Sequence, residues 1–169
     1  PAFRGPNWTP QAMGSELVVQ DIIDAVEYAK SQADIDCGRI YLLGGSGGGY
    51  GTLLMAGRAP QIWAACSAWC PISDIKKWHD ECRKAKRDYY KHIELSAGGD
   101  PQKDPKAAVE CRKRSANTYL AKAEGIPVEI ATGIHDGHSG SVPVSHTLEA
   151  FNVLAKPEDR LSEEDIRYF

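Results

Sequence analysis

The pattern Gly44-x-Ser46-x-Gly48 places one serine between two glycines, after the apolar run 39–43 and before the helix-like residues 52–56. This is the spacing of a nucleophile elbow, a sharp strand-to-helix turn that exposes a serine hydroxyl. A serine hydroxyl is a weak nucleophile, so it must stand clear of the backbone and face a base. Glycine at positions 44 and 48 would remove side chains that collide in such a turn. The pattern predicts that Ser46 is the nucleophile of an acyl-transfer enzyme.

Two other kinds of glycine-rich loop join a strand to a helix, and both bind phosphate groups. The spacing G-x-G-x-x-G of dinucleotide-binding loops starts at no position around Ser46. No lysine followed by serine or threonine comes after the glycines, which excludes a P-loop. A flexible glycine linker is disfavoured, because an apolar run precedes the glycines and a helix-like segment follows them. The nucleophile elbow is therefore the favoured interpretation.

A second candidate for chemistry is Asp136, which closely follows the apolar run 126–132. Catalytic groups in open α/β sheets gather at the carboxyl ends of the strands. Because neighbouring strands lie about 4.8 Å apart, sites two strands apart are separated by about 10 Å. In a Ser–His–Asp triad an imidazole bridges a gap of about that size. Asp136 is therefore predicted to orient a histidine that takes the proton of Ser46.

Asp136 also has alternative interpretations. It precedes Gly137, so it could form only a turn. With His135 and His138 it could ligate a metal, but three ligands in one turn seldom surround an ion without help from elsewhere. We therefore expect neither a metal nor a cofactor. Asp74, after the second apolar run, is a reserve candidate for the acid, although it also resembles a helix N-cap.

Apolar periodicity and helix-terminal residues predict the elements that position these side chains. Ser15 is expected to cap the first helix and Pro60 to end the helix after the elbow. Ser162 is expected to cap the last helix, with Asp165 at its third position. The predicted strands are 39–43, 62–69 and 126–132, and strand 39–43 should be buried on both faces. The other predicted helices cover 15–31 and 144–154. Their alternation predicts parallel βαβ units.

Length and composition are those of a globular protein. The chain has 169 residues, enough for one domain, and a net charge of -3, too small to indicate nucleic acid or an acidic substrate. No apolar run approaches the length of a membrane span, and no signal peptide is visible. The first residue is Pro1, so we expect a processed or truncated chain whose original start could have held a targeting signal.

Five cysteines, an odd number, cannot all be paired within the chain. The spacing Cys66-x-x-x-Cys70 does not fit a zinc site. Buried free thiols are favoured, one disulfide remains open, and the cellular compartment is left undetermined.

Residues 74–124 differ from the rest, because they are highly charged and mostly helical in propensity. We interpret them as an insertion in a single domain of residues 1–169, with a solvated basic face rather than a nucleic-acid patch. His79 and His92 are expected on its surface, and His146, outside it, is expected to be packed or solvated. Specificity is expected to reside in its aromatic residues, Trp78, Tyr89 and Tyr90.

Taken together, these segments resemble the α/β-hydrolase superfamily and, within it, the prolyl oligopeptidase-like group. The most specific segment is Asp36-x-x-Arg39-Ile40 followed by Gly44-x-Ser46-x-Gly48-Gly49-Tyr50. Other matching segments are Phe3-Arg4-Gly5, residues 21–26, Arg114-Ser115-x-x-x-Tyr119-Leu120, Pro127, Gly133-x-x-Asp136 and Val142-Pro143.

The resemblance implies a fold and a set of roles. The fold would be an α/β-hydrolase three-layer sandwich with a mainly parallel sheet, incomplete in this chain. Ser46 would be the nucleophile, Asp136 the triad acid, and the Gly47 amide one donor to the oxyanion.

The chain departs from the group's pattern in two ways. Residues 137–141 lengthen the loop between Asp136 and Val142. The group's histidine follows one further strand after the acid, whereas the last histidine here is His146. His138 is the stand-in base that chain order and location allow. The earlier strands and the second oxyanion donor would precede Pro1.

Two hypotheses follow. The first is a serine hydrolase that acts on a small ester or peptide substrate through an acyl-enzyme. The second is a non-catalytic relative, a binding or assembly module without a triad histidine. A three-stranded fragment would leave sheet edges and an apolar face uncovered, so a companion chain or a second copy is expected to complete the fold. Neither hypothesis involves nucleic acid or a membrane.

Overall fold

A computed structural model describes residues 4–169, so Pro1 and Phe3 of the sequence interpretation lie outside the described residues. The chain divides into two compact units. The first contains the chain up to Arg39 together with Ile75–Ser115, and the second contains Ile40–Asp74 and Ala116–Phe169. The predicted insertion, residues 74–124, thus overlaps the second segment of the first unit.

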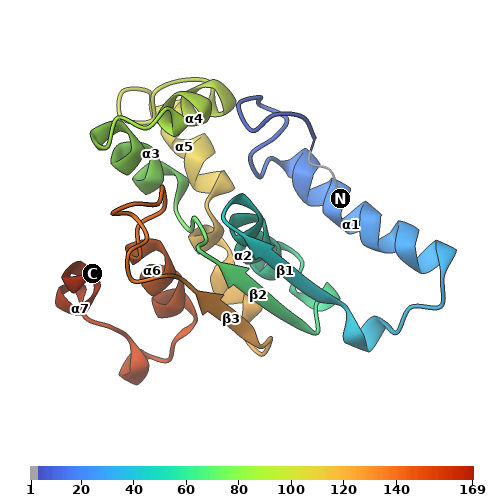
Figure 1. The fold of residues 1–169 in the computed structure, drawn as a ribbon. Coiled ribbons are helices and arrows are strands. Elements are labelled where there is room, and N and C mark those ends of the chain that lie inside the picture. Colours follow the sequence, from blue (N-terminus) through green and yellow to red (C-terminus); the bar gives the residue numbers. More distant parts are fainter. Residues whose placement is uncertain (1–3) are drawn as a thin grey trace. The chain divides into compact units, whose positions relative to one another are not determined.

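The second unit is built on a parallel three-stranded sheet (Figure 1). Its strands are β1 (Tyr41–Gly45), β2 (Ala65–Trp69) and β3 (Val128–Ala131), in the order β1-β2-β3. Gly45 is in register with Trp69, and Trp69 with Ala131, so the carboxyl ends of all three strands align. The predicted α/β class with a parallel sheet is confirmed.

Helix α2 (Gly47–Arg58) packs against β1 and β2 and carries the core of this unit. Leu53, Leu54 and Met55 on α2 are almost completely buried. Burying a side chain of this size contributes about 1.5–3 kcal/mol. The helix ends before Pro60, as predicted, since proline cannot continue it.

Two further helices follow β3 in the second unit. Helix α6 (Ser145–Leu154) packs against β3, and α7 (Glu163–Tyr168) packs against α6. A capping box between Ser162 and Asp165 begins α7, which confirms the predicted cap. Within the second unit, helices follow β1 and β3 as the sequence predicts, whereas the short 3-10 helices Ala116–Thr118 and Leu120–Ala123 lie between β2 and β3.

The prediction that the first strand is buried on both faces is wrong. Burial alternates along β1, where Tyr41 is 64% and Leu43 is 72% exposed while Leu42 is half-buried. A strand reads as continuously apolar when both faces are covered, but alternate residues of β1 are open here. The apolar run 39–43 therefore does not indicate a strand that is buried on both faces.

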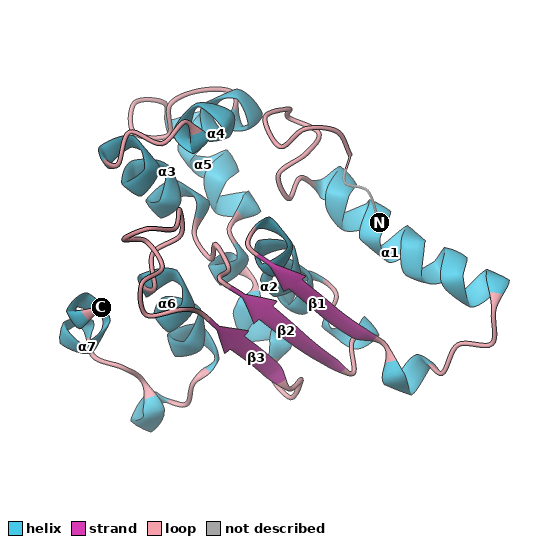
Figure 2. Ribbon diagram, viewed as in Figure 1, coloured by secondary structure: helices cyan, strands magenta, loops and turns pink. Residues whose placement is uncertain are grey.

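Among the described residues of the first unit, from Arg4 on, the regular structure is entirely helical (Figure 2). Helix α1 (Glu16–Gln32) is capped by Ser15, whose hydroxyl accepts the N–H of Val18, as predicted. Helices α3 (Ile75–Lys84), α4 (Tyr89–Ala97) and α5 (Pro105–Arg114) pack against one another. The buried guanidinium of Arg114 donates to the carbonyl oxygens of Ala12 and Pro10, which anchors the N-terminal segment to α5.

None of the five cysteines, all of which lie within the described residues, is in a disulfide, so the one disulfide left open by the sequence does not form. Cys66, Cys82 and Cys111 are buried, as favoured for free thiols, whereas Cys37 is exposed. No helix within residues 4–169 combines the length and the apolar character that crossing a bilayer requires.

Candidate active site

Ser46 lies at the turn between β1 and α2 with φ 53° and ψ −118°. A positive φ is uncommon for a residue with a side chain, and such strain clusters at functional sites. Its N–H donates to the carbonyl of Trp69 (2.8 Å), and its carbonyl accepts the N–H of Tyr50 (2.9 Å). Its exposed hydroxyl makes no capping hydrogen bond to α2, so it is available for chemistry.

The glycines that the elbow requires differ in part from those that the sequence predicts. A side chain at Gly44 would collide with the backbone of Gly48 and lie 2.9 Å from the Thr52 hydroxyl, so glycine is required there. A side chain at Gly48 would meet open space, so that part of the prediction is wrong. The second crowded position is Gly49, where a Cβ would lie 2.5 Å from the carbonyl oxygen of Trp69.

Gly47 is the first residue of α2 and is exposed. The N–H at a first helical position has no acceptor within the helix, and the helix dipole makes that end positive. An amide in this position can stabilise an oxyanion that develops beside Ser46. The geometry is consistent with the predicted role of Gly47, which remains a prediction.

Asp136 lies in the turn after β3, with its carboxylate fixed by neighbouring donors. Its Oδ2 accepts the Thr132 hydroxyl and the Gly133 N–H, each at 2.8 Å. The thiol of Cys70 also hydrogen-bonds to this carboxylate. These three donors, Cys70 foremost, hold the pKa of Asp136 below its usual value. Asp136 is therefore an oriented, ionised carboxylate.

Cys70 is a site residue that the sequence reasoning did not assign to the chemistry. It directly follows β2, and its N–H donates to the carbonyl of Ala131 (2.7 Å). Its φ of 46° lies in the left-handed region, as that of Ser46 does. Hydrogen bonding to Asp136 raises the pKa of the Cys70 thiol. The position of Cys70 directly after the second predicted strand could have identified it from the sequence.

The sheet places Ser46 and Asp136 after its two outer strands, at the edge where the three carboxyl ends align. The predicted stand-in base, His138, is exposed, and its Nε2 lies 3.4 Å from the carbonyl oxygen of Phe169. His135 is also exposed. The three donors described around the Asp136 carboxylate include no histidine.

His146 has a structural role, because it is buried and holds the segment that follows β2. It is completely buried on α6, and its Nδ1 accepts the N–H groups of Ser73 (3.2 Å) and Asp74 (3.4 Å). Since Nδ1 accepts, the proton of the neutral ring is assigned to Nε2. His146 thus fixes the segment that contains Asp74, the reserve candidate for the acid. Of the two predicted alternatives, packed or solvated, the structure selects packed.

Comparisons with known proteins agree with this architecture. The model of the prolyl oligopeptidase family matches residues 4–166. An acylaminoacyl peptidase from Pyrococcus horikoshii has a similar fold, with a TM-score of 0.66 and 22% identity. A second acylaminoacyl peptidase structure, in complex with Z-Gly-Gly-Phe-chloromethyl ketone, has a TM-score of 0.64 and 24% identity. Each alignment covers 81% of this chain but 20% of the other, so the chain spans about a fifth of their length. None of the curated proteins compared with the chain matches it.

Proposed function

Because the chain belongs to the prolyl oligopeptidase family, we propose that it contributes the nucleophile and the acid of a serine hydrolase. The reaction would cleave an ester or peptide bond through an acyl-enzyme on Ser46. The observation that carries this proposal is the strained elbow, in which the Ser46 hydroxyl is exposed and makes no capping bond. The oriented carboxylate of Asp136 at the same edge of the sheet supports it.

In the proposed reaction the Ser46 oxygen attacks the substrate carbonyl carbon while a histidine takes the hydroxyl proton. The Gly47 N–H stabilises the oxyanion of the tetrahedral intermediate. The intermediate collapses when the histidine returns the proton to the leaving alcohol or amine. Water then attacks the acyl-enzyme by the same steps and releases Ser46. Asp136 stays ionised throughout and stabilises the imidazolium.

The proposed base is a histidine, and His138 is the candidate that this chain offers. It follows Asp136 by two residues, and its ring would have to leave the Phe169 carbonyl to reach Ser46. If His138 acts as the base, His138→Ala abolishes turnover, whereas His135→Ala leaves it unchanged. Retention of full turnover by His138→Ala would assign the base to another histidine of the native protein.

The proposed substrates are small esters and peptides, and the two are separated by their leaving groups. An esterase releases an alcohol and a peptidase an amine, which requires protonation as it leaves. Turnover of p-nitrophenyl esters but not of the matching acyl-peptide anilides would assign the esterase. Turnover of both substrates would assign the peptidase.

The test of the proposal is labelling of the native full-length protein by a fluorophosphonate probe, which reacts with activated serines. We expect labelling that is lost in Ser46→Ala and retained in Ser31→Ala, which changes an exposed serine on α1. If the native protein is not labelled while a control hydrolase reacts, the acyl-enzyme proposal is wrong.

One observation favours the second candidate function, a non-catalytic binding or assembly module. The described donors to the Asp136 carboxylate are the Thr132 hydroxyl, the Gly133 N–H and the Cys70 thiol, rather than an imidazole. On this alternative the elbow is retained for the fold, and a companion chain or a second copy completes the sheet. If the chain is a non-catalytic module, it should associate tightly with its partner but should not be labelled by the fluorophosphonate probe. The same probe therefore separates the two functions.

A further inference from the structure

The first unit contains a group of side chains that the proposed hydrolysis does not use. His79 on α3, Glu94 on α4 and Asp100 in the turn before α5 converge. His79 Nε2 lies 3.1 Å from Glu94 Oε1 and 4.0 Å from Asp100 Oδ1. One potential ligand atom from each residue lies within 4.8 Å of the others.

His79 was expected on the surface, yet its side chain is completely buried. Its Nδ1 lies 3.0 Å from Asp80 Oδ1, an oxygen that also accepts the side-chain amide of Gln102. A carboxylate only accepts hydrogen bonds, so Nδ1 of His79 carries the proton. Nε2 faces Glu94 Oε1 in the same way, at 3.1 Å, so a metal ion bound at Nε2 would take the place of a proton there. A histidine held by a carboxylate in this way is the usual arrangement of a metal ligand.

The spacing of these atoms suits a small cation. Zinc binds imidazole nitrogen and carboxylate oxygen at about 2.0–2.2 Å, so ligands of a tetrahedral ion lie about 3.3–3.6 Å apart. The two distances from His79 Nε2, 3.1 and 4.0 Å, bracket that range. Small rotations of Glu94 and Asp100 suffice to reach it.

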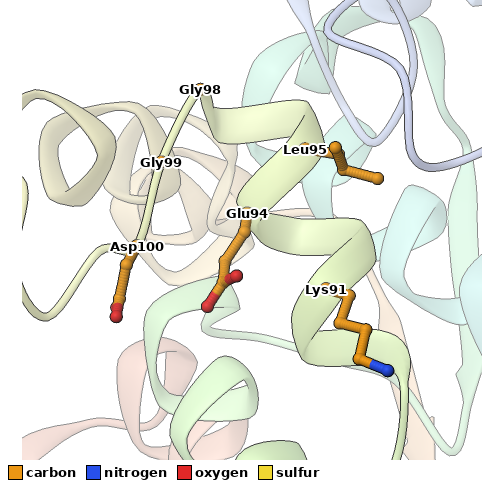
Figure 3. Close-up of a pocket in the computed structure, with 6 residues that line it drawn as sticks. All are labelled: Lys91, Glu94, Leu95, Gly98, Gly99 and Asp100. Atoms are coloured by element: carbon orange, nitrogen blue, oxygen red, sulfur yellow. The ribbon is translucent and has the colours of Figure 1, made fainter.

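A pocket of about 590 Å³ lies beside this cluster in the first unit. Glu94 and Asp100 both line it, together with Gly98, Gly99, Leu95 and Lys91. In Figure 3 the carboxylates of Glu94 and Asp100 lie near each other, and the Lys91 side chain extends away from them. The pocket leaves room for a water or another small ligand in the fourth coordination position.

Arg83 is the competing cation at this cluster. Its guanidinium donates to Asp100 Oδ2 (3.0 Å) and to Glu94. Asp80, Glu94 and Asp100 bring three carboxylates to the cluster, and Arg83 compensates one of them. The exposed Lys103 ammonium approaches Asp100 at 3.5 Å. A divalent ion would replace the contacts of Arg83 with Glu94 and Asp100 and bring two positive charges where the guanidinium brings one.

We propose that His79, Glu94 and Asp100 bind a divalent transition-metal ion of the Zn²⁺ type in the first unit. Asp80 orients the histidine, and water from the pocket completes the coordination. Imidazole with carboxylate oxygen is a ligand set that such ions accept. The ion links α3, α4 and the turn before α5, so its role is to stabilise the first unit. The proposal is independent of the hydrolase proposal.

The test uses the purified full-length chain after removal of metals with a chelator. Titration with Zn²⁺, followed by calorimetry, should show one site per chain, and the ion should raise the midpoint of thermal unfolding. Asp80→Asn should weaken the affinity by about 10- to 100-fold, since it removes the orienting carboxylate. Arg83→Gln should tighten it, because the competing guanidinium is lost. Asp88→Asn, which changes an exposed carboxylate paired with Lys91, should have no effect.

Two controls keep the result unambiguous. Glu94→Gln changes a partly exposed ligand and should abolish the site, so the test does not depend on whether a His79 variant folds. Co²⁺ should give a visible spectrum without thiolate charge-transfer bands, which excludes binding by the exposed Cys37. The proposal is overturned if Zn²⁺ does not bind, if Glu94→Gln binds it as tightly as the parent chain, or if Arg83→Gln binds it no more tightly. In that case the cluster is an ion-pair network only.

Discussion

At the scale of single residues, Gly44 and Gly48 differ sharply although the sequence pattern treats them alike. A methyl group at Gly44 would collide with the Gly48 backbone, whereas one at Gly48 would meet nothing within 4 Å. We expect Gly44→Ala to lower the free energy of unfolding by about 1–3 kcal/mol, as overpacking does. It should also displace Ser46 and abolish fluorophosphonate labelling. Urea unfolding and probe labelling of the variant measure the two effects.

Gly48→Ala is the matched control, because it adds the same atom to the same turn. Alanine is favoured over glycine within a helix by about 0.5–1 kcal/mol, and Gly48 lies in the first turn of α2. We expect this variant to be as stable as the parent or slightly more so, with labelling retained. Equal loss of stability in both variants would contradict the described geometry of the elbow.

A second prediction concerns the pKa of the Asp136 carboxyl group. The Cys70 thiol, the Gly133 N–H and the Thr132 hydroxyl stabilise the ionised form and so lower the pKa. A carboxyl with a lowered folded-state pKa contributes stability above its unfolded pKa, about 3.9, and loses it as pH falls through the folded value. We expect Thr132→Val and Cys70→Ala each to raise the pKa of Asp136, measured by carboxyl ¹³C NMR. Unchanged values in both variants would mean that these donors do not hold the carboxylate.

At the scale of elements, a buried histidine connects α6 to the segment after β2. His146 accepts the N–H groups of Ser73 and Asp74. His146→Ala removes the acceptor of both N–H groups, and an unpaired donor in a fully buried position such as Ser73 costs about 1–3 kcal/mol. We therefore expect a lower free energy of unfolding by urea denaturation. His135→Ala, at an exposed position, should change it by less than about 0.5 kcal/mol. Comparable losses in the two variants would refute the structural role of His146.

Local signals in the sequence predicted the helix ends well. Ser15 caps α1, Pro60 follows α2, and Ser162 with Asp165 begins α7 in a capping box. Each of these depends on residues within one or two turns of the helix end, so spacing alone reveals it. Strand starts were predicted too early, since short 3-10 helices precede both β1 and β2.

Contacts between distant residues could not be predicted from spacing. His146 meets Ser73 across 73 residues, and His79 is buried by partners from another helix, so the polarity of the segment around His79 was misleading. The same limit applies to the candidate site. Ser46 and Asp136 follow from local patterns at strand ends, whereas the contact of Cys70 with Asp136 arises from the pairing of β2 with β3.

At the scale of the whole molecule, one face of the sheet in the second unit carries three exposed apolar side chains beside the polar Ser67 and Glu129. Tyr41 and Leu43 are two residues apart on β1 and therefore point to the same face. Trp69 is in register with Gly45, the next residue of that series, so it shares this face. The exposed fractions are 64% for Tyr41, 72% for Leu43 and 49% for Trp69. Exposed apolar groups gathered in this way mark interaction surfaces.

We therefore expect the 169-residue chain on its own to self-associate through this face. Light scattering after size exclusion should give a mass that rises with concentration. Leu43→Glu should shift the chain towards monomer, because association would bury its charge. Leu95→Glu makes the same change at a 58% exposed leucine of α4 and should leave the mass unchanged. A parent chain that stays a folded monomer at every concentration would contradict the expectation that a second copy covers this face.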